Sequence, residues 1–327
     1  MMFSVVVCTR DRPAELARCL AALSRMEHPA FEVIVVDNAP RDDSVRRIVA
    51  QTPHRYVREE RPGLDRARNR GIAEARHGLI AFTDDDTEAE PGWLAALAGA
   101  FADPRVAGVT VRVLPGALDT PAQRLFEQYG NGMSKGERPR LFDGATLRPA
   151  ELLRAQDVGV GANMVFRREA LEAAGGFDPA LDVGTPARGA GDLDLFHRLL
   201  RSGAVLRYEP EARVRHHHRR DLAGLRQQIR NNGRSYGVYL LKVWRERSVP
   251  RPAVARFALG WCAWLGGRLV LGLLGRHRLP LSLLWAEVRG AFEAPSAFRL
   301  VYSPHGSETR DLQQARPAVP PRSHRRR

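Results

Sequence analysis

The chain has 327 residues, a formal charge of +14, 44% hydrophobic residues and three cysteines, Cys8, Cys19 and Cys262. This length favours one large domain with an appendage, or two domains, and the apolar content suffices for a packed core. An odd number of cysteines without ligand spacing argues against a disulfide framework or a zinc site, and predicts a reducing, cytoplasmic compartment. The N-terminus also lacks the features of a signal peptide.

The first part of the chain alternates between apolar strand-like runs and segments with helical spacing of apolar residues. The predicted strands are residues 3–9, 31–38, 55–60 and 78–86, and the predicted helices are residues 13–26, 42–52 and 63–76. This order is typical of a mainly parallel, Rossmann-like α/β sheet covered by helices, with ligands at the carboxyl ends of the strands. Asp11, Asp37 and Asp84 to Asp86 all follow strand runs, so we expect a site at that edge.

The middle of the chain is less regular. Residues 106–114 predict a strand, residues 115–155 are rich in loops, and residues 158–178 predict a strand and a helix that ends at Gly175 and Gly176. Residues 191–203 predict an amphipathic helix with acids in its first turn, and residues 207–220 predict the last strand. We therefore expect the catalytic domain to span residues 1–220.

Residues 221–302 differ in composition from the rest of the chain, and we expect them to form a basic and apolar helical region. Residues 222–247 predict a basic helix, and residues 254–278 are strongly apolar but contain Arg256 and Arg268. This run falls short of about 20 clean apolar residues, which favours a basic amphipathic hairpin on the inner face of the cell membrane over a spanning helix. The alternative is a helical subdomain buried against the catalytic domain. The proline- and arginine-rich residues 303–327 are predicted to be disordered.

Three consecutive aspartates, Asp84, Asp85 and Asp86, close the strand at 78–86. Carboxylates are hard ligands suited to Mg²⁺ or Mn²⁺, with substrate phosphates completing the shell. In an extended segment Asp84 and Asp86 point the same way and Asp85 points the other way. The alternative for such a run is a solvated acidic loop.

Seven motifs occur in an order that resembles the family 2 glycosyltransferases, which have the GT-A fold. They are "VVVCTRDRP", "VIVVDNAPRDDS", "GLDRARNRG", "FTDDDTEAEPGWL", "GANMVFRREAL", "GGFD" and "GDLDLFHRLLRSG". The resemblance covers about residues 3–218. It implies inverting transfer of a sugar from a nucleotide-diphosphate sugar, a UDP-sugar above all, to an acceptor hydroxyl, with Mn²⁺ or Mg²⁺ as cofactor. Such transfer serves glycan, glycolipid or natural-product glycosylation.

The resemblance also implies a set of donor-binding residues. They are Thr9, Arg10, Asp11, Asp37, Arg68, Asn69, Asp84 and Asp85. Asp37 matches the carboxylate that accepts hydrogen bonds from the nucleotide base, and the alternative for Asp37 is a helix N-cap. Arg68 could neutralise phosphate, and the alternative for Arg68 and Asn69 is a solvated helix face.

Further matches concern the metal and the catalytic base. Asp86 matches the metal ligand, and His216 or His218 matches an additional ligand; the alternative for both histidines is a polar edge strand. Asp192 matches the base that accepts the proton of the acceptor hydroxyl, with Asp194 as a competing candidate. The family commonly has glutamate before this aspartate, whereas this chain has Gly191, which puts acceptor contacts in doubt.

Two other functions are compatible with parts of the sequence. A sugar-phosphate nucleotidyltransferase would also use acids and Mg²⁺, but it needs a glycine-rich loop where this chain has "CTRDRP". A non-enzymatic polyanion-binding protein is suggested by the charge. No nucleic-acid partner is expected, because no aromatic residues are interleaved with the basic ones.

Overall fold

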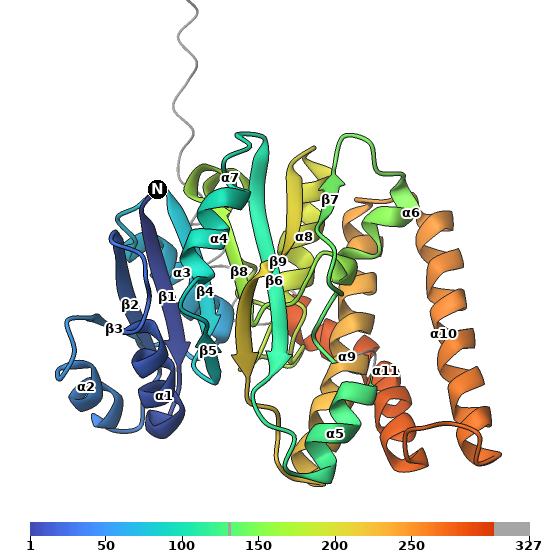
Figure 1. Cartoon of the computed structure of the whole chain (residues 1–327). Helices are drawn as coiled ribbons and strands as arrows, with labels where there is room; N and C mark the ends of the chain where they lie inside the picture. The colour runs from blue at the N-terminus through green and yellow to red at the C-terminus, as the bar shows by residue number, and fades with distance from the viewer. Residues whose placement is uncertain (130–131, 304–327) are drawn as a thin grey trace, which may run out of the picture.

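The computed structural model describes residues 1–129 and 132–303 of the chain. A nine-stranded sheet with helices on both faces is followed by three long helices at the C-terminal end (Figure 1). The strands are β1 Phe3–Thr9, β2 Phe31–Asn38, β3 Arg55–Glu59, β4 Leu79–Asp84, β5 Thr87–Ala89, β6 Val106–Pro115, β7 Arg140–Asp143, β8 Asn163–Arg167 and β9 Val205–His216. The predicted α/β architecture with covered sheet faces is confirmed.

Helices connect most of these strands. They are α1 Pro13–Leu23, α2 Ser44–Val49, α3 Leu64–Glu74, α4 Trp93–Ala100, α5 Pro121–Gln128, α6 Pro149–Leu152, the 3-10 helix η1 Ala155–Asp157, α7 Arg168–Ala174, α8 Gly191–Arg201, α9 Leu222–Glu246, α10 Arg251–Leu273 and α11 Leu281–Tyr302. Within the loop-rich stretch 115–155, α5, β7 and α6 are short, which explains why apolar periodicity did not reveal them.

The strand order is β3-β2-β1-β4-β8-β6-β9-β5, and β7 also pairs with β9. The half from β3 to β4 is parallel, as predicted. In the other half β8 runs antiparallel to β4 and β6, and β5 runs antiparallel to β9. These reversals carry late parts of the chain back to the edge where β4 ends.

The sheet is buried because its strands are apolar on both faces. Every residue of β1 is buried, and alternate residues serve two cores: Val6 and Cys8 face one, and Val5 and Val7 face the other. Helices α3, α7, α8 and α9 cover the first face, and α1, α2 and α4 cover the second. The edge at the carboxyl ends of the strands is thereby left for polar residues.

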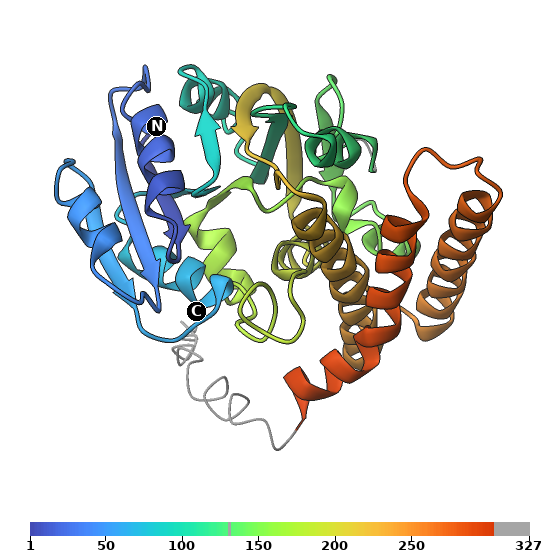
Figure 2. The ribbon, with the colours of Figure 1, turned by 90° about the horizontal axis from the view of Figure 1, so that it is seen from below.

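The three C-terminal helices differ in how far they pack against the rest of the molecule. Helix α9 places Tyr239, Leu240 and Val243 in the core beneath the sheet, as expected of a packed subdomain. Helix α11, which falls within the helical region expected at 221–302 but was not given bounds of its own, lies alongside α9, and α10 lies on the outside of the group (Figures 1 and 2). Among the described residues, α10 alone is long and apolar enough to cross a bilayer, and little of it is buried. The predicted disordered tail, apart from Ser303, lies outside the described residues.

Candidate active site

The carboxyl ends of β1, β2 and β4 bring the predicted acids to one edge. Thr9 lies opposite Asp37 in the β1–β2 register, and Cys8 lies opposite Asp84 in the β1–β4 register. Thr9, Asp37 and the start of the aspartate run therefore stand side by side, as the order of strands and helices predicted.

A second strand pairing adds a histidine to this edge. Thr87 of β5 pairs with His216 of β9, so the residue before Thr87 lies beside the end of β9. As a result Asp84, Asp86 and His216 form a cluster whose ligand atoms lie within 4.8 Å of one another. Asp86 Oδ1 is 3.2 Å from His216 Nε2. The residues are 130 positions apart in sequence, and only the sheet topology joins them.

This cluster fits a divalent metal ion. Octahedral Mg²⁺ holds its ligands at about 2.1 Å, which places neighbouring ligand atoms about 3.0 Å apart. The 3.2 Å between Asp86 Oδ1 and His216 Nε2 is close to this spacing. Within residues 1–129 and 132–303, the buried Asp86 Oδ1 accepts no hydrogen bond, which is unusual for a carboxylate oxygen without a cation. The imidazole ligand suits Mn²⁺ as well as Mg²⁺.

Arg12 binds one carboxylate oxygen of Asp85 and one of Asp86 and so fixes the orientation of both side chains. It was not singled out in the sequence. Its Nη1 donates to Asp85 Oδ1 at 2.6 Å and its Nη2 to Asp86 Oδ2 at 2.8 Å. Thr9 Oγ1 donates to Asp85 Oδ2 at 2.7 Å. Asp85 therefore points away from the cluster, as predicted, but it anchors Thr9 and Arg12 rather than facing a donor. The only sequence signal for Arg12 was its place in the basic "CTRDRP" turn after β1.

The pKa values of Asp84 and Asp86 are shifted in opposite directions. Burial alone would raise the pKa of Asp86, but His216 and Arg12 outweigh burial and lower it below the ordinary value. For Asp84, burial dominates and raises the pKa to about 6, with Arg68 opposing and Asp86 reinforcing the shift. A nearby cation would therefore stabilise the charged form of Asp84 more than it would stabilise a solvated carboxylate.

His218 stands behind His216 and not in the cluster. The two Nδ1 atoms are 3.0 Å apart, and His218 Nε2 contacts Glu127 Oε1 at 2.7 Å. His217 points elsewhere, to Glu88 Oε1 at 2.7 Å. Of the two histidines left open by the sequence, the structure brings His216 to the aspartates.

Arg68 forms a buried ion-pair network. Its Nη1 donates to Asp65 Oδ1 at 2.9 Å and to Asp182 Oδ2 at 2.7 Å, and its Nη2 is 3.9 Å from Asp84 Oδ1. Its charge is therefore already compensated by carboxylates. Neither Asp65 nor Asp182 was singled out in the sequence. Asp182 is 114 residues from Arg68, whereas Asp65 lies only one helical turn before it.

Asn69, predicted to bind the donor, has a structural contact instead. Its amide donates to Phe177 O and accepts from Phe177 N, both at 2.8 Å. Both polar atoms of the side chain are used in joining α3 to the segment after α7. The structure does not bring Asn69 to the other predicted site residues.

Asp192 and Asp194 have different environments. Asp192 accepts hydrogen bonds from Gly161 N at 2.7 Å and Leu193 N at 2.9 Å. Burial, reinforced by Asp182, raises its pKa. Asp194 is buried in ion pairs with Lys242 Nζ at 2.5 Å and Arg198 Nε at 2.8 Å. Asp194 is thus committed to holding α8 against α9, whereas Asp192 retains access to open space.

That open space is a cavity of about 1110 Å³ beside the cluster. Asp84, Arg68 and Asp192 line it, and so do residues of α9 and α10. The lining from the later elements includes Lys135, Arg188, Asn231, Tyr236, Phe257, Trp261 and Trp264. Burial lowers the pKa of Lys135. The lining of the cavity therefore combines acidic, basic, polar and aromatic side chains.

Asp37 lies at the end of β2, fully covered, and does not line this cavity. Tyr56 Oη donates to its Oδ2 at 3.0 Å, while Oδ1 has no hydrogen-bond partner among the described residues. Burial raises the pKa of Asp37 to about 6. It does not cap a helix, since Asp43 precedes α2.

Arg10 and Asp11 lie in the turn after β1, at the surface. Asp11 has a φ of 54° and accepts from Arg41 N at 3.0 Å. Both residues are near the end of β2 but outside the cavity.

Solved structures with a similar fold define the class of this domain. A mannosyltransferase from Pyrobaculum calidifontis, solved with GDP-Man and Mn²⁺, matches with a TM-score of 0.60 over 90% of this chain and 86% of its own, at 20% identity. TarS of S. aureus, solved with UDP-GlcNAc, matches with a TM-score of 0.52 over 74% of this chain and 67% of its own, at 16% identity. The fold is therefore GT-A-like.

The amino-acid sequence also matches a known protein family. Residues 4–175, more than half of the chain, match glycosyl transferase family 2, so the chain belongs to that family. A curated relative, the pre-mycofactocin glycosyltransferase of Mycobacterium tuberculosis, is 31% identical over 230 residues. That match covers 67% of this chain but only 43% of the relative. Family membership favours sugar transfer over the nucleotidyltransferase and non-enzymatic alternatives.

Proposed function

We propose that the protein is a metal-dependent, inverting glycosyltransferase that moves a sugar from a nucleotide-diphosphate sugar to an acceptor hydroxyl. The observation that carries the proposal is that Asp84 of the metal-ligating cluster and Asp192 line the same cavity. The buried Arg68 also lines it, with its Nη2 3.9 Å from Asp84 Oδ1 and 3.5 Å from Gly161 O.

In this proposal Asp84, Asp86 and His216 hold Mn²⁺ or Mg²⁺. When bound, the metal supplies positive charge that stabilises the departing nucleoside diphosphate. Arg12 keeps Asp86 Oδ1 directed at the metal by binding Oδ2. Thr9, Arg10, Asp11 and Asp37 lie where β1 and β2 end, and there they bind the nucleoside. Asp37 contributes the carboxylate that accepts from the base.

Asp192 is the proposed catalytic base. The acceptor oxygen attacks the anomeric carbon while Asp192 takes the hydroxyl proton, and the bond from that carbon to the diphosphate oxygen breaks. Attack opposite the leaving group inverts the configuration. A carboxylate with a raised pKa accepts a proton more readily, and the hydrogen bonds from Gly161 and Leu193 hold it in place.

The donor nucleotide is proposed to be UDP, as the motifs suggest, with GDP as the competitor because the Pyrobaculum neighbour was solved with GDP-Man. A thermal-shift screen of UDP- and GDP-sugars, each with and without Mn²⁺, tests the proposal. A donor at 100 times its Kd stabilises the fold by about 2.7 kcal/mol. We expect a Mn²⁺-dependent shift with one nucleotide class. If no nucleotide sugar stabilises the protein in either condition, the proposal is wrong.

A further inference from the structure

The net positive charge of the chain comes entirely from residues 222–327. Residues 1–221 contain 32 basic and 32 acidic residues and are formally neutral. Residues 222–303 contain 13 basic and three acidic residues, a formal charge of +10, and residues 304–327 carry the remaining +4. Such an asymmetry indicates that an anionic partner meets the C-terminal helices and not the catalytic sheet.

The same helices expose large apolar side chains. Leu259 and Leu273 of α10 are 72% and 67% exposed, and Phe292 of α11 is 78% exposed. We call this surface the outer face; its other exposed apolar residues are Trp264, Val270, Leu271, Leu274, Leu281, Trp285 and Leu300. Soluble monomers rarely present so many neighbouring large apolar groups without a binding partner.

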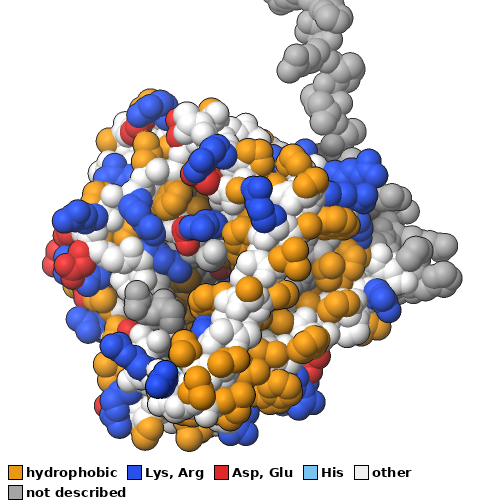
Figure 3. Space-filling model, turned by 90° about the vertical axis from the view of Figure 1, so that its right-hand side faces the viewer, with side chains coloured by type: hydrophobic (Ala, Val, Ile, Leu, Met, Phe, Trp, Pro, Cys, Tyr) orange, Lys and Arg blue, Asp and Glu red, His pale blue; other side chains and the backbone are white. Residues whose placement is uncertain are grey.

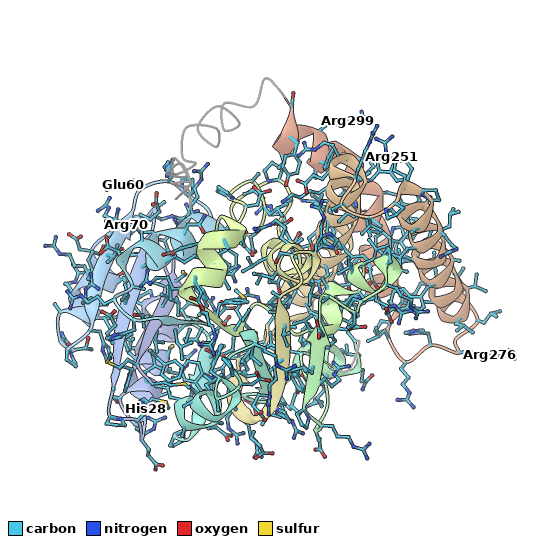
Figure 4. The ribbon with its side chains drawn as sticks, turned by 90° about the horizontal axis from the view of Figure 1, so that it is seen from above. His28, Glu60, Arg70, Arg251, Arg276 and Arg299 are labelled. Atoms are coloured by element: carbon cyan, nitrogen blue, oxygen red, sulfur yellow. The ribbon has the colours of Figure 1, made fainter. Side chains whose placement is uncertain are left out.

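Basic residues border this apolar surface. Figure 3, in which the α10 side faces the viewer, shows hydrophobic side chains across the face and Lys and Arg at its margins. Arg251 and Arg299 lie at one end of the helix pair, and Arg276 lies at the other end of α10 (Figure 4). An apolar centre with a cationic margin complements a bilayer with anionic headgroups.

Two features favour docking on the bilayer over crossing it. Arg268 Nη1 is tied to Glu287 Oε2 of α11 at 2.6 Å, and Tyr129 Oη donates to Glu287 Oε1 at 2.8 Å. Helix α10 is thereby fastened to α11, and through Glu287 to Tyr129, in the C-terminal third of its length. A span would also place Arg256 and Arg268 in hydrocarbon, which is costly.

We infer that the outer face docks on an anionic lipid bilayer, with α10 and α11 lying in the membrane interface. The inference does not depend on the proposed sugar transfer. It does have a consequence for that reaction: Phe257, Trp261 and Trp264 of α10 also line the cavity, so docking holds this part of its wall beside the lipid headgroups.

Vesicle sedimentation of the full chain tests the inference. We expect the protein to pellet with phosphatidylcholine vesicles that contain phosphatidylglycerol, and to bind more weakly to pure phosphatidylcholine or at high salt. The double variant Leu273→Glu, Phe292→Glu should lower binding about tenfold or more. Its matched control is Leu118→Glu, Leu141→Glu, which adds the same charge at exposed sites outside the outer face.

Both double variants alter exposed side chains, and a thermal unfolding curve like that of the wild type shows that each is folded. The inference is overturned if folded wild-type protein does not bind anionic vesicles, or if the outer-face variant binds as well as its control. A wild-type dimer that the outer-face variant converts to monomer, without vesicle binding, would assign the face to a second copy of the chain. Binding to duplex DNA that survives the substitutions, again without vesicle binding, would assign the charge to nucleic acid.

Discussion

Gly191 and Asp65 fill one space between α8 and α3. A Cβ atom on residue 191 would lie 2.0 Å from Asp65 Oδ2, and Asp65 is fully buried with Oδ1 bound by Arg68 at 2.9 Å. Related transferases commonly carry glutamate at the position of Gly191. Here the carboxylate of Asp65 on α3 occupies the space that a side chain at residue 191 would need, which explains why glycine fits at this position.

The close contact predicts a large cost for any side chain at residue 191. Gly191→Ala should lower the free energy of unfolding by roughly 1–3 kcal/mol, because the carboxylate it strikes is held by Arg68. Gly99→Ala on α4 is the control: nothing lies within 4 Å of its Cβ, and alanine favours the helix. Denaturant titration of both variants checks this, and equal effects would contradict the packing argument.

Substitution of Asp194 should mainly lower stability, whereas substitution of Asp192 should mainly lower activity. Asp194→Asn removes a carboxylate from Lys242 and Arg198 and should lower the free energy of unfolding by roughly 1–3 kcal/mol. Asp192→Asn should cost little stability, because burial already disfavours its charge, while slowing sugar transfer about 10²- to 10⁴-fold. Unfolding curves and release of nucleoside diphosphate measure the two effects. A stable but inactive Asp194→Asn would reverse the assignment.

Asp37 predicts a particular pH dependence of stability. Its pKa is about 6 in the folded protein against an ordinary value of 3.8, so the folded state holds the proton more tightly. The folded state therefore loses stability as the pH rises from about 4 through 6, by roughly 1–3 kcal/mol. Asp37→Asn should match the wild type near pH 4 and exceed it at pH 8, at the expense of nucleotide binding. An unchanged pH slope in this variant would show that Asp37 is not the group responsible.

Much of the fold was predictable because its signals are local. The β-branched runs of β1, β2 and β4 and the helical spacing of α1 and α3 identify the parallel half of the sheet, and with it the edge that holds Thr9, Asp37 and Asp84. Three-residue β5 and four-residue β7 were missed because such strands form only through pairing with β9. The bounds of helix α11 were not predicted within the helical region 221–302, because its apolar pattern was not distinguished from the preceding hydrophobic run.

The site was less predictable, because its contacts join distant residues. Asp84 and Asp86 were expected to act together, but the choice of His216 over His218 depends on the β5–β9 register. Arg12 and Asp65 carried no distinctive local pattern, and their roles follow from their partners. Asn69 matched a family motif, yet its polar atoms are used by Phe177.

The central claim is that Asp86 belongs to a metal site that binds the donor, whereas Asp192 acts only in the chemical step. Calorimetric titration of the nucleotide sugar identified by the screen, in the presence of Mn²⁺, tests this directly in Asp86→Ala and Asp192→Asn. The account predicts binding close to wild type in Asp192→Asn and no detectable Mn²⁺-dependent binding in folded Asp86→Ala. Donor binding by Asp86→Ala with wild-type affinity and metal dependence would contradict it.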